Sequence, residues 1–453
     1  MKRIFAMILS VLLVFSLFAC TGSEPDASTG ESDVVVTDTS TDVSSSTLSQ
    51  TETNTDSDSD SEVSSTVSSE VTETETDEVS SDSASTDTNT DTATDTSSEA
   101  SSETSTDTDT TTPSTSTTTD TEPDEDAVKA PTVDELRAGH FLAITDQLND
   151  AIVVIDLDAE NPSSDAAIVW QWTVYDHKDM PATHRKLCAN RLDDVRLRVC
   201  DAWGGAVVGV TSSSGLVALV EYPSGKCLFS ADMKGYGPHS IEILPNGLIA
   251  VAASGNGDNS KAVLRIYSAT SKDDTNFVEV PLASAHGVLW DPRQEVLWAL
   301  GSPELNQYTV GGTRQAPTLT LKKKANIKFG GGHDLSVMFN NPDVMWLTGS
   351  NVAQYNKTTD SITYEYDGKA DINKGNVKSI NTFPDGVTAM TIADTKNTTA
   401  KHNTDKIRVF RYVEEGGTKV YKYTEIWFDV FDGDNCDTER DFYKVRAFIA
   451  DYQ

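Results

Sequence analysis

Three features of the sequence predict an all-β fold of six four-stranded sheets arranged as a β-propeller. Short strand patterns separated by turn clusters fill residues 129–453, and no long stretch there has helical periodicity. Strands with a leading histidine recur as PHSIEI, AHGVLW and GHDLSV. Their histidines, His239, His286 and His333, are separated by equal intervals of 47 residues, which matches one propeller blade. A pair of β-sandwiches, the alternative fold, does not explain this fixed period.

The first residues of the chain, MKRIFAMILSVLLVFSLFAC, have the pattern of an export signal. Lys2 and Arg3 precede an apolar run from Ile4 to Ala19. This run is shorter than the ~20 residues of a membrane-spanning helix, and it suits a secretory signal. We therefore predict a signal peptide over residues 1–19 and export from the cytoplasm.

The end of this segment, Leu17-Phe18-Ala19-Cys20, resembles the lipobox of bacterial lipoproteins. In that family the cysteine becomes the lipid-modified first residue of the mature protein. The resemblance implies a lipid anchor at Cys20, which would attach the protein to the bacterial cell membrane on its extracytoplasmic side, exposed at the surface. An ordinary signal peptide followed by a chance cysteine is the alternative.

Residues 20–128 form a low-complexity linker of Ser, Thr, Asp and Glu. With so few large apolar side chains, it cannot bury enough surface to offset the entropy of ordering, so we expect it to be disordered. It carries most of the excess acidity of the chain, which has 71 Asp and Glu, 35 Lys and Arg, and a net charge of −36. This acidity argues against nucleic acid as a partner. Mutual repulsion should keep the linker extended as a tether.

Residues 129–453 are long enough for a large core and are predicted to form one monomeric propeller domain. Their cysteines have neither the dense spacing of a disulfide framework nor the spacing of zinc ligands. We therefore expect mostly free or buried thiols, although an even number in an exported domain also permits two disulfides. These cysteines are Cys188, Cys200, Cys227 and Cys436.

The blades can be placed along the chain by comparing the repeated strands. KSINTFPDG, from Lys378, repeats HSIEILPNG, from His239, and DVRLRV, from Asp194, has the same form. FLAITDQ, AIVVIDL and AIVWQW supply three strands of a further blade that lacks an innermost one. The C-terminal KVRAFIADYQ, from Lys444, parallels DVRLRV and would supply it. Closing the ring in this way removes exposed sheet edges.

Two of these repeats resemble those of known propellers. Pro238-His239-Ser240-Ile241, followed by Pro245-Asn246-Gly247, is similar to the repeat of streptogramin-lyase-like propellers, and Ala285-His286-Gly287-Val288 is similar to a second copy. Secreted six-bladed arylsulfotransferases and lipoproteins of unassigned function have repeats in the same style. The resemblance implies the propeller fold. Oligogalacturonate lyases, which are also propellers, hold a divalent metal with several histidines. The resemblance to propellers therefore also implies that a metal could bind to the histidines here.

The first residues of the innermost strands ring one mouth of the central channel of a propeller. Three neighbouring positions of this ring are histidines. Their imidazoles could bind a divalent metal ion together, or one could act as a general base while the other two orient the substrate. Asp194 stands beside them as a fourth metal ligand or as an acceptor behind the ligands. Alternatively, the repeat duplicated a structural histidine whose ring bonds to loop carbonyls. In blade order the ring reads Asp194, His239, His286, His333, Lys378 and Lys444.

The other side of the predicted ring is cationic. Lys378 and Lys444 begin their strands. Arg196 and Arg446 lie two residues further along the strands that begin at Asp194 and Lys444. Such an arc would hold the carboxylates of an acidic sugar by charge-assisted hydrogen bonds. Gln147, in the loop after FLAITD, should lie on the same face and contribute to substrate binding. In the alternative, the cations pair with acidic residues, namely Asp194, Asp334, Asp371 or Asp441.

These features predict an exported protein that acts on or binds acidic carbohydrate at a histidine-ringed channel mouth. The leading reaction is β-elimination from a uronide by a metal-assisted polysaccharide lyase. In such a reaction, a cation or metal stabilises the developing charge while a histidine removes the α-proton. Glycoside cleavage is a second enzymatic reading. The non-catalytic alternative is a surface propeller that binds glycan or protein and has structural histidines.

The remaining histidines and four tryptophans are weaker candidates. His140 begins a strand that should place it on the opposite face, and His402 should be exposed on a hairpin. His177 and His184 lie in the connection before the second blade, which either covers the channel mouth or is a solvated loop. The tryptophans are more typical of blade core than of sugar platforms; they are Trp170, Trp172, Trp298 and Trp346.

Overall fold

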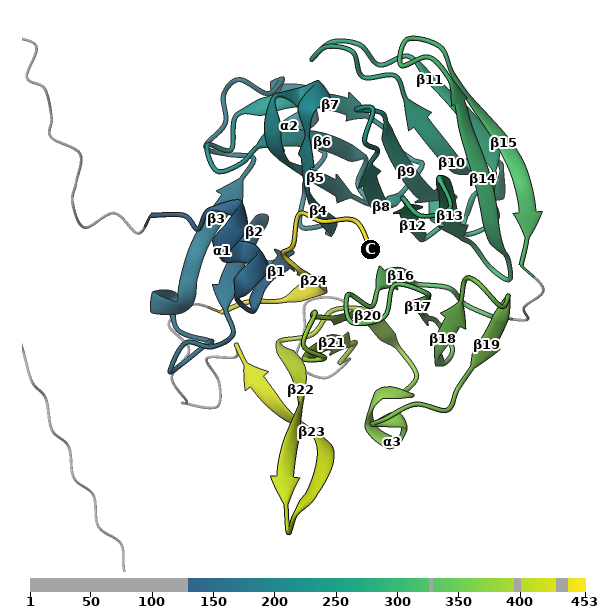
Figure 1. Cartoon of the computed structure of the whole chain (residues 1–453). Helices are drawn as coiled ribbons and strands as arrows, with labels where there is room; N and C mark the ends of the chain where they lie inside the picture. The colour runs from purple at the N-terminus through teal and green to yellow at the C-terminus, as the bar shows by residue number, and fades with distance from the viewer. Residues whose placement is uncertain (1–128, 326–328, 395–400, 429–438) are drawn as a thin grey trace, which may run out of the picture. The chain divides into compact units, whose positions relative to one another are not determined.

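The computed structural model describes residues 129–325, 329–394, 401–428 and 439–453. The predicted signal peptide, Cys20, the linker and Cys436 lie outside these residues. The described chain forms six antiparallel four-stranded sheets placed around a common centre (Figure 1). The predicted all-β fold with six blades is therefore confirmed. Among the described residues, no helix is both long and apolar enough to cross a membrane.

Each sheet is one blade, and its strands follow one another outward from the centre (Figure 1). Blade 1 consists of β24 (Phe442–Ala447), β1 (Phe141–Asp146), β2 (Ala151–Asp156) and β3 (Ile168–Thr173). Blade 2 consists of β4 (Leu192–Cys200), β5 (Gly205–Ser212), β6 (Leu216–Glu221) and β7 (Cys227–Asp232). Blade 3 consists of β8 (Pro238–Ile243), β9 (Ile249–Ser254), β10 (Ala262–Tyr267) and β11 (Phe277–Pro281).

Blades 4 to 6 repeat this order. Blade 4 consists of β12 (Gly287–Asp291), β13 (Val296–Leu300), β14 (Leu305–Gly312) and β15 (Pro317–Lys324). Blade 5 consists of β16 (Asp334–Val337), β17 (Val344–Thr348), β18 (Val352–Asn356) and β19 (Ser361–Thr363). Blade 6 consists of β20 (Val377–Thr382), β21 (Thr388–Ile392), β22 (Lys406–Glu415) and β23 (Thr418–Trp427). The α-helices in the described ranges are short: α1 (Val133–Ala138), α2 (Ala182–Arg185) and α3 (Lys369–Ile372).

The apolar core lies between neighbouring blades. Strand β9, IAVAAS, is buried along its whole length, because successive side chains point to opposite faces of the sheet and both faces are covered. Val251 packs in a cluster with Val217 of blade 2, whereas Ala250 packs in a cluster with Val288 of blade 4. The four predicted core tryptophans are also buried, which confirms that prediction.

Strand β24 closes the ring. Strand β1 pairs antiparallel with β2 on one side and with β24 on the other, so that Leu142 lies between Ile155 and Ala447. The Thr145 hydroxyl adds a side-chain bond across the closure, because it donates to the carbonyl oxygen of Lys444 at 3.1 Å. The predicted closure by the C-terminal strand is confirmed.

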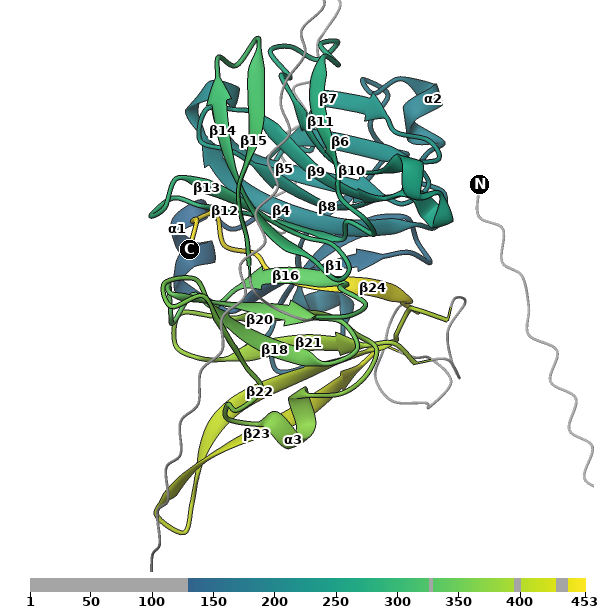
Figure 2. The ribbon, with the colours of Figure 1, turned by 90° about the vertical axis from the view of Figure 1, so that its right-hand side faces the viewer.

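The two faces of the ring carry different parts of the chain. The innermost strands begin at one face, called the histidine face here because the three repeat histidines stand there. The C-terminus and α1 lie close together at the opposite face (Figure 2). There, Nε2 of Gln453 donates to the carbonyl oxygen of Met338, just after the end of β16, and Arg137 of α1 pairs with Asp451 at 2.9 Å. Both ends of the domain therefore lie opposite the histidines.

The described cysteines are structural. Cys188, Cys200 and Cys227 are free and buried, and burial raises the pKa of all three thiols. Because the thiolate is the reactive form, these thiols are poor nucleophiles. The expectation of free or buried thiols is confirmed for the cysteines that the structure describes.

Candidate functional site

A cavity of about 270 Å³ opens at the histidine face. It lies where the innermost strands begin, so residues far apart in the sequence meet in it. Four of the predicted site residues, the three repeat histidines and Lys378, line it together. The residues that line this histidine-face cavity are Arg191, Asp193, Ser213, His239, Asn256, His286, His333, Lys378, His402 and Tyr443.

His239 is held by a buried carboxylate. Its Nδ1 lies 2.9 Å from Oδ1 of Asp193, which stands at the start of β4. The other oxygen of Asp193 accepts a hydrogen bond from the backbone N–H of Ser213. Because a carboxylate only accepts hydrogen bonds, Nδ1 of His239 is the donor in this bond, and in the neutral imidazole Nε2 therefore has the lone pair. This pairing orients the imidazole as a proton acceptor.

His286 stacks on His239, with ring centroids 4.3 Å apart and planes inclined by 17°. Its Nδ1 donates to the carbonyl oxygen of Ser284 at 2.8 Å, which leaves Nε2 with the lone pair. Burial holds the pKa of His286 well below its ordinary value, and the neighbouring histidines and Lys444 act in the same direction. His286 is therefore neutral at neutral pH.

His333 and Lys378 form a second pair. Nζ of Lys378 lies 3.1 Å from Nε2 of His333, so the ammonium donates to the imidazole. Burial and the charge of Lys378 lower the pKa of His333 to about 3. Burial and the charge of Lys444 lower the pKa of Lys378 to about 8. Nδ1 of His333 is buried without a hydrogen-bond partner among the described residues, so a ligand or water oxygen could satisfy it.

The cavity also contains residues that the sequence analysis missed. His402 was predicted to be exposed, and this is wrong: it is partly buried, with its ring edge-to-face on Tyr443 at 5.9 Å and Nε2 3.4 Å from Nη1 of Arg191. His402 lies in the connection from β21 to β22. Because the loop after the second strand of a blade returns to the histidine face, the rule that placed Gln147 there also places His402, Ser213 and Asn256.

A buried layer of charges lies beneath the cavity. Nε of Arg446 donates to Asp194 at 2.7 Å, and its Nη1 donates to Asp334 at 2.6 Å. Nζ of Lys444 lies 3.3 Å from Asp334 and donates to the carbonyl oxygen of His239 at 3.0 Å. Arg446 thereby links carboxylates from blades 2 and 5 across the centre.

The predicted substrate cations therefore divide into two groups. Lys378 lines the cavity, whereas Lys444, Arg446 and Arg196 lie in the buried layer. Arg196 is 3.9 Å from Asp194 and 4.0 Å from Glu242. Lys444, Arg446 and Arg196 therefore pair with carboxylates, which is the alternative to substrate binding that the sequence left open.

Gln147 and the remaining histidines have structural contacts. Gln147 lies on the histidine face as expected, but its Nε2 donates to the carbonyl oxygen of Leu192 at 2.8 Å and bridges two blades. His140 lies 2.6 Å from Asp158 and 3.0 Å from Asp385, in the turns that follow β2 and β20 on the opposite face, which confirms its predicted position.

His177 and His184 do not reach the histidine-face cavity. His177 stacks on Trp172 at 5.9 Å between ring centroids, and Nδ1 of His184 lies 2.9 Å from the hydroxyl of Ser230. The segment before β4 that contains His177 and His184 also contains Arg191, which does line the cavity.

The contacts of the histidines bear on the predicted divalent metal. One ring nitrogen of each repeat histidine already bonds to a protein group. The carboxylate of Asp194 accepts from Arg446 and from the hydroxyl of Ser240. Within the described ranges, no group of three or more His, Cys, Asp or Glu side chains is arranged to hold a metal ion. A metal on these residues stays a prediction.

Comparisons with known proteins give a family without an assigned activity. The model of a family described as "Family of unknown function (DUF6528)" matches residues 114–432. No curated protein matches the chain significantly. Among solved structures, the chain is similar to a functionally unknown protein from Desulfotomaculum acetoxidans DSM 771, with 13% identity, a TM-score of 0.37, and coverage of 63% of this chain and 79% of that chain. A likeness at this TM-score supports no statement about function.

Proposed function

The chain belongs to the DUF6528 family of unknown function, and we propose that its propeller binds acidic carbohydrate in the histidine-face cavity and cleaves it by β-elimination. The composition of this single cavity carries the proposal. It combines the imidazole of His239, whose neutral form has its lone pair on Nε2, with the cationic side chains of Lys378 and Arg191. Elimination from a uronide requires such a base beside a cation that binds the carboxylate.

In the proposed reaction, Arg191 and Lys378 bind the carboxylate of the substrate. Their charge stabilises the enolate-like transition state that forms as the proton leaves the carbon next to the carboxylate. Nε2 of His239 takes that proton, and the electron pair of the broken C–H bond forms the new C=C bond. The neighbouring C–O bond to the leaving sugar breaks, and the leaving oxygen takes a proton from Lys378. Exchange with solvent then returns both side chains to their starting protonation states.

The imidazoles of His286 and His333 position the base and the cation of the proposed reaction. His286 packs flat against His239 and, being neutral, places no positive charge beside the base. His333 accepts from Lys378 and thereby directs the ammonium. The lowered pKa of Lys378 makes it a better proton donor to a leaving oxygen than an ordinary lysine.

The proposal is tested by incubating the purified protein with polygalacturonate, alginate and chondroitin sulfate, with and without added divalent metal. Ultraviolet absorbance of unsaturated product should rise with at least one of these polymers and stay flat with a neutral glucan. Binding without product would support the non-catalytic alternative. The absence of both binding and product would contradict the proposal. Activity that depends on added metal would assign a metal to the site.

Lys378 should make the binding of acidic sugars dependent on pH. As the pH rises through about 8, its ammonium loses its proton, so the affinity for an acidic oligosaccharide should fall. In the same cavity, burial lowers the pKa values of His286 and His333 well below this range and raises the pKa of Tyr443 well above its ordinary value. The step near pH 8 therefore belongs to Lys378.

Calorimetric titration at pH values on both sides of 8 checks this expectation. Lys378→Met should bind more weakly than the parent at neutral pH and should lose the step. An identical pH profile in parent and variant would show that Lys378 does not hold the ligand. Lys374→Met, at an exposed lysine of the same blade region, serves as the matched control and should retain the step.

We also propose that the protein is a lipoprotein held at the cell surface through Cys20. The lipobox-like Leu17-Phe18-Ala19-Cys20 and the polar linker over residues 20–128 support this location. Cys20→Ala should move the protein from the membrane fraction to the soluble fraction. Unchanged membrane partitioning of this variant would contradict the anchor.

A further inference from the structure

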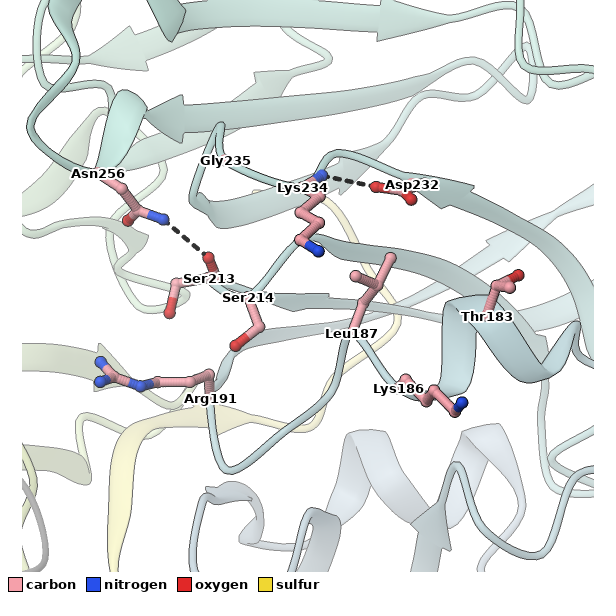
Figure 3. A pocket seen from close by; sticks show the side chains of 10 residues that line it. All are labelled: Thr183, Lys186, Leu187, Arg191, Ser213, Ser214, Asp232, Lys234, Gly235 and Asn256. Atoms are coloured by element: carbon pink, nitrogen blue, oxygen red, sulfur yellow. Dashed lines mark hydrogen bonds between the residues drawn. The ribbon is translucent and has the colours of Figure 1, made fainter.

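A second cavity adjoins the histidine-face cavity, between α2 and the loops of blades 2 and 3 (Figure 3). Its volume is about 800 Å³. Arg191, Ser213 and Asn256 line both cavities, so the two cavities adjoin at these three residues. We call the second cavity the lysine groove, because Lys186 and Lys234 line it.

The boundary between the two cavities is fixed by the fold. Nδ2 of Asn256 donates to the carbonyl oxygen of Ser213 at 3.0 Å, a bond drawn in Figure 3. The backbone N–H of Asn256 donates to the hydroxyl of Ser254 at 3.3 Å. Asn256 also adopts a left-handed backbone with φ 49°, which asparagine tolerates better than most residues. These contacts hold Asn256 in place at the boundary between the two cavities.

The described residues that line the lysine groove carry more positive than negative charge. Lys186, Arg191 and Lys234 line it together with a single acidic residue, Asp232. Asp232 accepts a hydrogen bond from the backbone N–H of Lys234 at 2.7 Å, rather than from an ammonium (Figure 3). Over the described ranges, none of the three cationic side chains is in an ion pair, in contrast to the cations of the buried layer.

We infer that the lysine groove binds further acidic units of the same carbohydrate chain, so that the substrate is a polyanionic polymer rather than an isolated acidic sugar. This inference rests on the proposed function and extends it from one sugar unit to a chain. One unit would occupy the histidine-face cavity, with Arg191 at the boundary. The next units would pass Lys186 and Lys234, whose ammonium groups bind carboxylates or sulfates by charge-assisted hydrogen bonds.

The length of the ligand should therefore decide its affinity. A short oligosaccharide fills the histidine-face cavity without reaching the lysines, whereas a longer one gains their contacts within a single bound molecule. Two exposed charge pairs together should improve the affinity by roughly two- to thirtyfold. Salt should weaken the binding of the long ligand more than that of the short one.

The experiment titrates the full chain with disaccharides and octasaccharides prepared from polygalacturonate, alginate and chondroitin sulfate. It compares the parent with Lys186→Ala/Lys234→Ala and with the control Lys322→Ala/Lys374→Ala, which removes the same charge from exposed positions outside the groove. The groove variant should bind octasaccharides about as weakly as disaccharides, with disaccharide binding unchanged. The control should keep the preference for length.

Two outcomes would overturn the inference, and they are distinguishable. If the parent binds disaccharides and octasaccharides equally well, or if the groove variant and the control behave alike, the groove has no part in binding while the proposed function stands. If the parent binds none of these oligosaccharides, the proposed function fails and the inference fails with it. Thermal melting of both variants verifies that the lysine substitutions leave the fold intact.

Discussion

His239→Ala should lower the turnover number for elimination by about 10²- to 10⁴-fold, which is the usual contribution of a general base. The reason is geometric: Asp193 fixes Nδ1 of His239 as a donor, so Nε2 is the proton acceptor in the cavity. The Michaelis constant should change little, because Lys378 and Arg191 still bind the carboxylate. Steady-state kinetics on the polymer that gives product in the panel above measure both parameters.

A substitution of Asp193, the partner of His239, tests the same role of the imidazole. Asp193→Asn keeps the size of the side chain but removes the charge that orients the imidazole, so it should also lower the turnover number and shift the pH profile. His140→Ala, on the opposite face, is the matched control and should retain the parental turnover number. Parental turnover in His239→Ala would remove His239 from the mechanism.

Arg446→Leu should destabilise the propeller by about 3–5 kcal/mol, the usual cost of removing one partner of a buried ion pair. In the parent, Arg446 bonds to both Asp194 and Asp334, and all three side chains are buried. Its loss would leave two buried carboxylates from blades 2 and 5 without their closest cation, with Arg196 at 3.9 Å from Asp194 and Lys444 at 3.3 Å from Asp334 as the remaining ones. Chemical denaturation at neutral pH measures the change in the free energy of unfolding.

The pH dependence of this effect has a defined sign. Although burial opposes it, the charge of Arg446 keeps the pKa of both Asp194 and Asp334 below the ordinary value. Stability from such groups is present above their unfolded pKa of about 4 and is lost as the pH falls below it. In the variant, protonation neutralises the two carboxylates that lack Arg446, so parent and variant should converge in acid.

A surface ion pair provides the control for the buried one. Arg293 lies 2.8 Å from Asp343, and both side chains are about half exposed. Arg293→Leu should therefore leave the free energy of unfolding nearly unchanged. If Arg446→Leu had an equally small effect, the buried layer would not stabilise the ring.

The architecture could be predicted because it repeats. The equal spacing of the histidines sets the blade length, and the similarity of KVRAFIADYQ to DVRLRV identifies β24 as the missing innermost strand. Strand direction alone then places the histidines on one face and both ends of the domain on the other. The blade length, the closing strand and the two faces all follow from the repeat along the chain, and this repeat is visible in the sequence.

The site could be predicted only in part, because much of it depends on contacts across the ring. Nothing local to Arg446 shows that it bonds to Asp194 and Asp334, since these belong to three different blades. Arg191 lies in a connection without a repeat and could not be placed from spacing. His402 follows the loop rule that placed Gln147, so its position could have been inferred from strand order.

The most direct test of the proposed site is a crystal structure of His239→Ala bound to an acidic octasaccharide that the parent cleaves. The account predicts one carboxylate between Arg191 and Lys378 in the histidine-face cavity, the position of the missing imidazole beside the adjoining carbon, and further units along Lys186 and Lys234. An octasaccharide bound elsewhere on the propeller, with the histidine-face cavity filled only by solvent, would contradict it.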